Sequence, residues 1–197
     1  MKTLLKIDSS IRLNNSFSRA LGDHFLTCWC EKHPTGKIIS RDLHTRPVPH
    51  LTEATVQAFF GGPASYDNLA LSDELINEIN VCDEILITCP MYNFHIPSSL
   101  KAYLDHVVRV NKTFQYTDGK YKGLLTNKRC YLLTTMGGKK NGSMQNTGVE
   151  NYLRNILEFI GINDTVLFCI DGTADLNYAT PILAETKMKI TNSISIL

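Results

Sequence analysis

The chain has 197 residues, of which 43% are hydrophobic and 20% are charged, a balance typical of a folded α/β protein and not of a disordered one. Its 20 basic and 19 acidic residues leave a formal charge of +1, which argues against nucleic acid or an anionic membrane as the principal partner. No apolar run reaches transmembrane length, and Asp8 interrupts the first apolar residues too early for a signal peptide. We therefore expect a single domain over residues 1–197.

The six cysteines include no Cys-x-x-Cys pair. Cys28, Cys30 and His33 are near one another in sequence, but no fourth ligand stands at a spacing suited to zinc. Three other cysteines fall within apolar runs, where a free thiol behaves as a small buried hydrophobe. We expect no metal and a reduced, cytoplasmic protein.

The first predicted strand is Thr3–Ile7, whose apolar residues suit a central parallel strand. A hydroxyl-rich loop from Ser9 to Ser18 follows and leads into a helix that Asn15 or Ser16 can cap. Hydroxyls and free N–H groups at a helix start favour an anion. The loop contains neither a Gly-x-Gly-x-x-Gly motif nor a Walker lysine, so an anion site and simple helix capping both remain open.

The next elements are a strand at Lys37–Arg41 and a helix at Thr52–Phe60, which Gly61-Gly62-Pro63 terminates. Ala58, Phe59 and Phe60 are either core residues or an exposed patch that a second subunit covers. A further helix is expected to begin at Ser72, because Ser-Asp-Glu precedes apolar residues at helical spacing.

A buried strand at Glu84–Cys89 stops at Pro90, which cannot donate a hydrogen bond to a neighbouring strand. Met91, Tyr92, Asn93 and Phe94 follow it, at the carboxyl end of a strand, where open α/β sheets bind ligands. Aromatic faces and an amide in this position suit a flat heterocycle. The next helix opens at Ile96-Pro97-Ser98, and Lys101, Asp105 and Arg109 are predicted to face away from the core.

Phe114–Tyr121 alternates around Asp118-Gly119, which predicts a β-hairpin inserted into the α/β pattern. The fourth strand, Arg129–Thr134, ends in Thr135-Met136-Gly137-Gly138, a loop whose glycines allow close approach of a planar ligand and positive φ. An ordinary turn would use the same residues. The polar segment Lys139–Gly148 is predicted to be mobile.

The last elements are a helix around Tyr152–Ile160, a strand at Thr165–Ile170 and a helix that runs to Leu197. Strands thus alternate with helices, without internal repeats or a linker. This pattern predicts a flavodoxin-like, doubly wound, five-stranded parallel sheet with a β-hairpin insertion.

Three segments carry a resemblance to a known family: PMYNF at 90–94, IPSSLKAYLD at 96–105 and TFQYT at 113–117. They resemble the FMN-dependent NADH:quinone oxidoreductases of the azoreductase family, formerly named acyl-carrier-protein phosphodiesterases. The likeness runs from the first strand to Ile162. It implies bound FMN, NADH as electron donor, quinones and azo compounds as acceptors, and a homodimer.

The resemblance also implies roles for individual residues, matched position by position. The FMN phosphate would be held by Ser10, Ser16, Phe17 and Ser18. The isoalloxazine ring would be lined by Met91, Tyr92, Asn93 and Phe94, and its pyrimidine side would contact Thr135, Met136, Gly137 and Gly138. Tyr116 and Phe159 would shape the substrate pocket. No side chain is assigned as a catalytic acid or base, because the flavin carries the hydride chemistry.

His95 neighbours the ring loop, and we expect it to be solvated or to cap a helix. Two positions depart from the family pattern. Met136 stands where an Arg is often found, which bears on substrate range and nicotinamide preference, and Asn111 replaces a Gly before the hairpin.

Three functions other than an FMN-dependent oxidoreductase are compatible with parts of the sequence. A flavodoxin-type electron carrier would be strongly acidic, which the charge of +1 does not match. A phosphodiesterase would need a metal or nucleophile constellation that the sequence does not display. A non-catalytic flavin-binding protein remains open.

Overall fold

The computed structural model describes residues 1–62, 66–140 and 148–196. At its centre is a five-stranded sheet in the order β2-β1-β3-β6-β7, in which every neighbouring pair is parallel. The strands are β1 (Thr3–Asp8), β2 (Lys37–Asp42), β3 (Glu84–Pro90), β6 (Arg129–Thr135) and β7 (Asp164–Ile170). This is the strand order of the flavodoxin-like doubly wound fold, so the predicted fold is confirmed.

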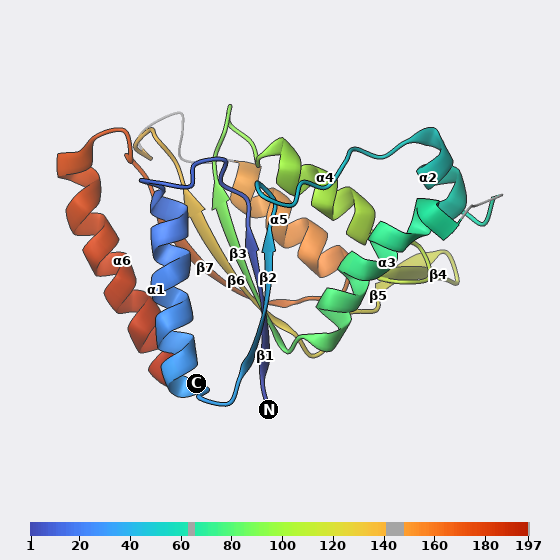
Figure 1. Cartoon of the computed structure of the whole chain (residues 1–197), viewed down its shortest axis with the longest axis horizontal. Helices are drawn as coiled ribbons and strands as arrows, with labels where there is room; N and C mark the ends of the chain where they lie inside the picture. Colours follow the sequence, from blue (N-terminus) through green and yellow to red (C-terminus); the bar gives the residue numbers. More distant parts are fainter. Residues whose placement is uncertain (63–65, 141–147, 197) are drawn as a thin grey trace.

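Helices cover both faces of the sheet (Figure 1). On one face lie α1 (Phe17–Lys32) and α6 (Leu176–Ile196), which pack against each other. On the other lie α3 (Tyr66–Val81), α4 (Ser98–Val107) and α5 (Gly148–Phe159), with the short α2 (Glu53–Phe59) beside α3. None of the helices in the described ranges is both long and apolar enough to cross a membrane.

The central strands are apolar at successive positions because both faces of the sheet are buried. Leu4 and Leu86 point into a cluster with Phe25 and Trp29 beneath α1 and α6. Their chain neighbours Leu5, Ile85 and Ile87 point into the cluster beneath α3, α4 and α5. Alternating side chains therefore fill two cores from one sheet.

The predicted hairpin is present as β4 (Phe114–Thr117) and β5 (Lys120–Gly123), paired antiparallel. Asp118 and Gly119 have φ values of 53° and 73°, as a two-residue turn of type I′ requires. Asn111, just before the hairpin, has a φ of 61°, in the left-handed region that favours glycine and that asparagine tolerates.

The hairpin is held against the end of α5. The rings of Phe114 and Phe159 lie 4.6 Å apart, and the Leu125 N–H donates to the Ile160 carbonyl at 2.9 Å. Gly123 lies directly against the Gly161 backbone.

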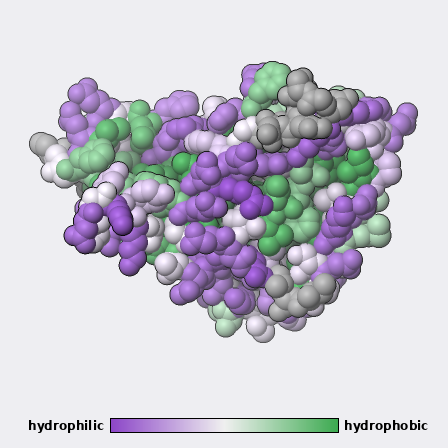
Figure 2. Space-filling view, turned by 180° about the vertical axis from the view of Figure 1, so that it is seen from behind, coloured by the Kyte–Doolittle hydropathy of each residue, from purple (hydrophilic) through white to green (hydrophobic). Residues whose placement is uncertain are grey.

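At the end of the molecule that carries α2 and the hairpin, hydrophobic residues reach the surface beside hydrophilic ones (Figure 2). Phe60 is 76% exposed, Tyr116 66% and Tyr121 60%. Phe60 is therefore not a core residue, whereas Phe59 is partly buried and packs beneath the Arg109 guanidinium.

Two sequence-based predictions are wrong. Helix α3 begins at Tyr66, not at Ser72. Ser72 lies inside the helix, and its hydroxyl donates to the His106 carbonyl at 2.7 Å instead of capping a helix. Arg109 does not face away from the core: it lies beyond the end of α4, is buried and pairs with Asp73 at 2.7 Å. The predictions on Pro63, on Leu197 and on 141–147 of the mobile segment fall outside the described residues.

The contact between Gly123 and Gly161 generates a stability prediction. A Cβ at Gly123 would stand 2.1 Å from the Gly161 nitrogen, and backbone cannot yield as a flexible side chain does. We expect Gly123→Ala to destabilise the protein by about 1–3 kcal/mol, measured by urea unfolding.

Gly148→Ala is the matched control, because a Cβ there meets no described atom within 4 Å. A Gly123→Ala protein that unfolds at the wild-type urea concentration would contradict the close contact.

Candidate functional site

Three loops that follow β1, β3 and β6 meet at one edge of the sheet, where the carboxyl ends of parallel strands lie together. They enclose a cavity of about 190 Å³. Its lining comes from all three predicted loops and from the loop after β7: Ser10, Arg12, Ser16, Phe17, Pro90, Met91, Tyr92, Thr135, Gly137 and Thr173.

The first loop gathers hydroxyl groups at the start of α1. Ser16 is the N-cap of this helix, and its Oγ accepts the Arg19 N–H at 3.4 Å. The same Oγ donates to Ser10 Oγ at 3.0 Å and lies 3.1 Å from Ser18 Oγ. The N–H groups of Phe17 and Ser18 have no acceptor within the helix, as in every first helical turn. This arrangement suits an anion.

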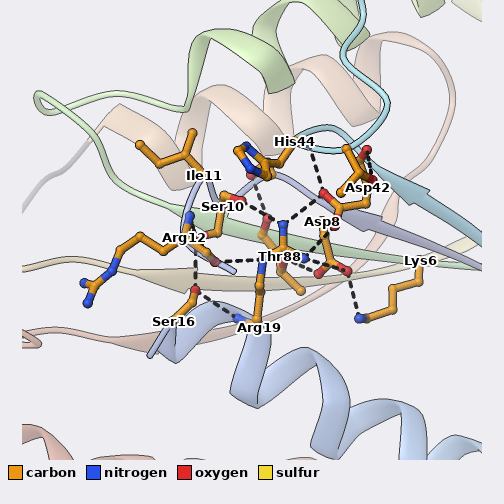
Figure 3. A network of polar contacts seen from close by, with 12 residues as sticks. Lys6, Asp8, Ser10, Ile11, Arg12, Ser16, Arg19, Asp42, His44 and Thr88 are labelled. Carbon is orange, nitrogen blue, oxygen red and sulfur yellow. Dashed lines mark hydrogen bonds and ion pairs between the residues drawn. The ribbon is translucent and has the colours of Figure 1, made fainter. Parts of the chain in front are cut away.

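Arg19, in the first turn of α1, ties this loop to the sheet (Figure 3). Its Nε donates to the Arg12 carbonyl at 3.0 Å and its Nη2 to the Ser10 carbonyl at 2.8 Å. The guanidinium also forms a two-pronged pair with Asp42 at the end of β2, at 2.8 and 2.9 Å. Arg12 itself points its side chain away from the network in Figure 3.

A second part of the network lies on β1. Asp8 accepts hydrogen bonds from Lys6 Nζ at 2.8 Å and from Thr88 Oγ1 at 2.7 Å, and both carboxylate and ammonium are buried. Burial alone would lower the pKa of Lys6, but Asp8 and Asp23 outweigh it and hold this pKa above its ordinary value. Lys6 therefore stays charged inside the protein.

The second loop makes a tight turn from Tyr92 to His95, closed by two backbone hydrogen bonds of 2.9 and 3.0 Å. Asn93 and Phe94 at its tip have φ values of 47° and 64°. Such values in non-glycine residues cost conformational energy and are concentrated at functional sites.

Hydrogen bonds join the second loop to both of its neighbours. The Ile11 N–H donates to the Tyr92 hydroxyl at 3.3 Å, and the Met91 N–H donates to the Thr135 carbonyl at 2.7 Å. The three loops therefore form one connected frame around the cavity.

A wider cleft of about 810 Å³ continues from the cavity. Met91 and Tyr92 line both spaces, and the cleft is otherwise bounded by Ile11, Asn93, His95, Ile96, Pro97, Ser98, Ser99 and Lys101. His95 is exposed, with its ring 4.9 Å from that of Tyr152. It does not cap α4, whose N-cap position is occupied by Pro97.

The third loop differs in part from expectation. Gly137 lines the cavity, and a Cβ there would meet only Ala174 Cβ, at 3.9 Å, so the backbone is open to close approach. Neither Gly137 nor Gly138 has a positive φ, and the neighbouring loop has one at Gly172. Met136 is only 3% exposed, so its side chain belongs to the interior.

Several predicted site residues do not line the cavity: Ser18, Asn93, Phe94, Met136, Gly138, Tyr116 and Phe159. Ser18 contributes through Ser16, and Asn93 lines the wider cleft. Phe159 is held between the rings of Phe114 and Tyr121, and Tyr116 lies exposed on the hairpin; neither lines the cavity or the cleft.

Sequence reasoning did not assign Arg12, Pro90 or Thr173 to the site, although all three line the cavity. Pro90 was interpreted only as the end of a strand. Arg12 lies inside the predicted hydroxyl loop, but an arginine in a loop has no local pattern that separates a site residue from an exposed one. Thr173 follows β7, next to β6 in the sheet, so the rule that ligands sit at strand ends could have found it. Its N–H and hydroxyl donate to the Met136 carbonyl at 3.0 and 3.1 Å.

The chain matches, over residues 1–194, the family described as having a flavodoxin-like fold. A relative named FMN-dependent NADH:quinone oxidoreductase, from Hydrogenovibrio crunogenus, is 46% identical over 181 residues, which span 88% of this chain and 90% of that protein. A relative of the same name from Nostoc punctiforme is 36% identical over an alignment of 203 positions, gaps included, which covers 99% of each chain.

Solved structures with the same fold include an azoreductase from Bacillus anthracis str. Sterne, with a TM-score of 0.90, 23% identity and full coverage of both chains. An FMN-dependent NADH-azoreductase from Bacillus anthracis str. Ames Ancestor, in complex with FMN, has a TM-score of 0.86 and 23% identity over 99% of this chain and 98% of that one.

The ion pair between Arg19 and Asp42 generates a prediction of pH dependence. Burial opposes ionisation of Asp42, but the Arg19 hydrogen bonds and the His44 N–H outweigh it and lower the pKa of this carboxyl. A lowered folded-state pKa gives stability that is complete above the unfolded-state value, about 4, and that is lost as pH falls through the folded-state pKa.

We expect Asp42→Asn to cost about 1–3 kcal/mol of stability at pH 7, since it removes hydrogen bonds to charged groups. The difference from wild type should shrink as the pH is lowered below about 4. Urea unfolding at pH 7, 4 and 3 measures it, and an undiminished difference at pH 3 would contradict the assigned ion pair.

Proposed function

We propose that this chain, which belongs to the flavodoxin-like family of FMN-dependent NADH:quinone oxidoreductases, binds FMN and passes electrons from NADH to quinones and azo compounds. The observation that carries the proposal is the connected frame of three loops, with hydroxyls at a helix start on one side and an aromatic turn on the other. Six free cysteines are typical of a reduced compartment, and we propose a cytoplasmic location.

We propose that FMN occupies both the cavity and the wider cleft. A cavity of about 190 Å³ is too small for the whole cofactor and suits its phosphate end, beside the hydroxyls of Ser10 and Ser16 and the N–H of Phe17. Met91 and Tyr92 line both this cavity and the wider cleft, so the flat ring would lie along them, with Gly137 allowing close approach. When bound, FMN supplies the hydride chemistry, and the protein positions it.

A direct test separates an oxidoreductase from a one-electron carrier or a non-catalytic flavin protein. The purified protein should be yellow, and NADH alone should bleach it under anaerobic conditions, with no partner reductase. A yellow protein that NADH does not bleach would refute the proposed activity while leaving flavin binding intact.

The compact hydroxyl cluster at Ser16 predicts FMN and not FAD, because it offers one anion site and no dinucleotide motif accompanies it. Aspartate caps a helix as well as serine does, so Ser16→Asp should keep α1 while its charge repels the phosphate. We expect FMN affinity to fall at least about tenfold, which corresponds to about 1.4 kcal/mol.

Ser16→Thr is the matched control, since it keeps both the hydroxyl and the capping function. Mass spectrometry of the released cofactor identifies the flavin. Release of FAD, or a Ser16→Asp protein as yellow as wild type, would count against this assignment.

The cleft beside Met91 and Tyr92 predicts the order of the reaction. We propose that one flat ligand at a time lies against one ring face in this cleft, so NADH should leave before the acceptor enters, which is ping-pong kinetics. Double-reciprocal plots at several quinone concentrations should be parallel, and an azo bond should consume two such rounds.

Tyr116 and Phe159 would shape the acceptor pocket, so Tyr116→Phe should change acceptor preference more than the rate of flavin reduction. Intersecting plots would refute the ping-pong order. Loss of NADH oxidation in Tyr116→Phe would show that this tyrosine has another role.

We also propose a homodimer whose subunits complete each other's sites. Within one chain Tyr116 and Phe159 line neither the cavity nor the cleft, and Phe60 and Tyr121 leave aromatic surface exposed at the same end of the molecule. A second copy would cover this surface and bring the hairpin to its partner's pocket.

Shared sites make activity depend on association, so specific activity should fall when the protein is diluted below its dimer dissociation constant. Analytical ultracentrifugation measures that constant. A species that sediments as a monomer and keeps full activity at the assay concentration would exclude shared sites.

A further inference from the structure

We infer that Arg19 is a positioning residue for the phosphate end of the cofactor: it holds the first loop so that N–H and hydroxyl groups, not carbonyl oxygens, face a bound anion. The inference rests on the proposed FMN site.

The first argument is the geometry of the guanidinium. Its planar fork bonds two loop carbonyls, those of Ser10 and Arg12, and both oxygens of Asp42. A lysine ammonium, a single point of charge, cannot reproduce this set of bonds. The Arg19 side chain is only 13% exposed, so these bonds form in the protein interior.

The second argument is the effect on the loop carbonyls. A carbonyl oxygen is the negative end of its dipole and repels a phosphate, whereas N–H and O–H groups attract one. With the carbonyls of Ser10 and Arg12 bonded to Arg19, the start of α1 is left to meet the anion. The Ser10 and Ser16 hydroxyls donate here to the Arg12 carbonyl at 3.3 Å and to Ser10 Oγ at 3.0 Å, and rotation about their C–O bonds turns these donors to the anion.

The third argument is charge. Arg19 and Lys6 stand against three carboxylates, those of Asp8, Asp23 and Asp42. Arg19 is thus already neutralised and does not act as a free cation for the ligand. Its removal would disorder the loop and also leave Asp8 and Asp42 less compensated beneath a phosphate. Both effects weaken phosphate binding and spare the flavin ring.

The experiment compares FMN with riboflavin, which has the same ring and ribityl chain but no phosphate. Cofactor-free protein is titrated with each flavin, and quenching of flavin fluorescence gives both dissociation constants. We expect Arg19→Lys to weaken FMN binding at least tenfold while riboflavin binding changes less than threefold.

Arg41→Lys is the matched control. Arg41 is also a buried arginine held by two carboxylates, Glu74 and Glu78, but these come from α3 and not from the loops of the site. This variant should lose stability and keep the wild-type ratio of riboflavin to FMN dissociation constants. Should Arg19→Lys fail to fold, Asp42→Asn, which removes the anchor of the guanidinium, is expected to lower the same ratio.

The positioning role would be overturned if Arg19→Lys left the ratio of the riboflavin to the FMN dissociation constant unchanged, as it would if both flavins lost affinity equally. Arg19 would then be a stabilising residue only. Wild-type protein that binds FMN no more tightly than riboflavin would overturn the phosphate site itself, and the role of Arg19 with it. These two failures are distinguishable because the second is seen in the unmodified protein.

Discussion

Parallel pairing of β1, β3 and β6 is the constraint on which the site depends. Because these strands run in one direction and in register, their carboxyl ends reach the same edge, and the loops that follow are adjacent without further instruction. Two hydrogen bonds then suffice to join the loops: Ile11 N–H to the Tyr92 hydroxyl and Met91 N–H to the Thr135 carbonyl. The hydrophobic layers on both faces stabilise the sheet, and the sheet brings together the loops that these hydrogen bonds and Arg19 then hold in place.

The two charged residues on β1 show how charges can be buried in the middle of the sheet. Lys6 and Asp8 occupy a central strand that is otherwise apolar, where an unpaired charge would be strongly unfavourable. Each is satisfied by a specific partner, Lys6 by Asp8 and Asp23, and Asp8 also by Thr88. The sheet tolerates these charges because each one has a partner of opposite charge. Asp8 also pairs with Arg19, which holds the first loop.

Local patterns predicted much of this structure, while long-range contacts explain what they missed. The strands, the Asp118-Gly119 hairpin and the three loops at strand ends follow from short-range periodicity and turn chemistry, which one sequence displays directly. Ser72 and Arg109 were misplaced because each bonds a group more than thirty residues away. No local signal distinguishes a serine that caps a helix from one that bridges two.

The same reasoning applies within the site. Ser10, Ser16 and Gly137 were assigned through the family resemblance. Local chemistry, with hydroxyls at a helix start and glycine at a strand end, was compatible with a site but left capping and an ordinary turn open. The packing of the loop after β7 against the loop after β6 decides two further features. Met136 is buried, and Thr173 lines the cavity. Tyr116 and Phe159 lie apart from the cavity of their own chain, a relation that only three-dimensional placement reveals.

The ion network under the first loop also bears on the order in which the chain can acquire its structure during synthesis. Its five charged groups, from Lys6 to Asp42, all belong to the first βαβ unit. Among the residues that the structure describes, Thr88 is the one later residue that bonds Asp8. The other side of the cavity needs residues as far along as Thr173. Contacts between nearby segments form with a smaller loss of chain entropy, so these ion pairs can form early in synthesis. Helix α1 packs mainly against β3, β6 and α6, so the first loop reaches its final position only after those later elements have left the ribosome.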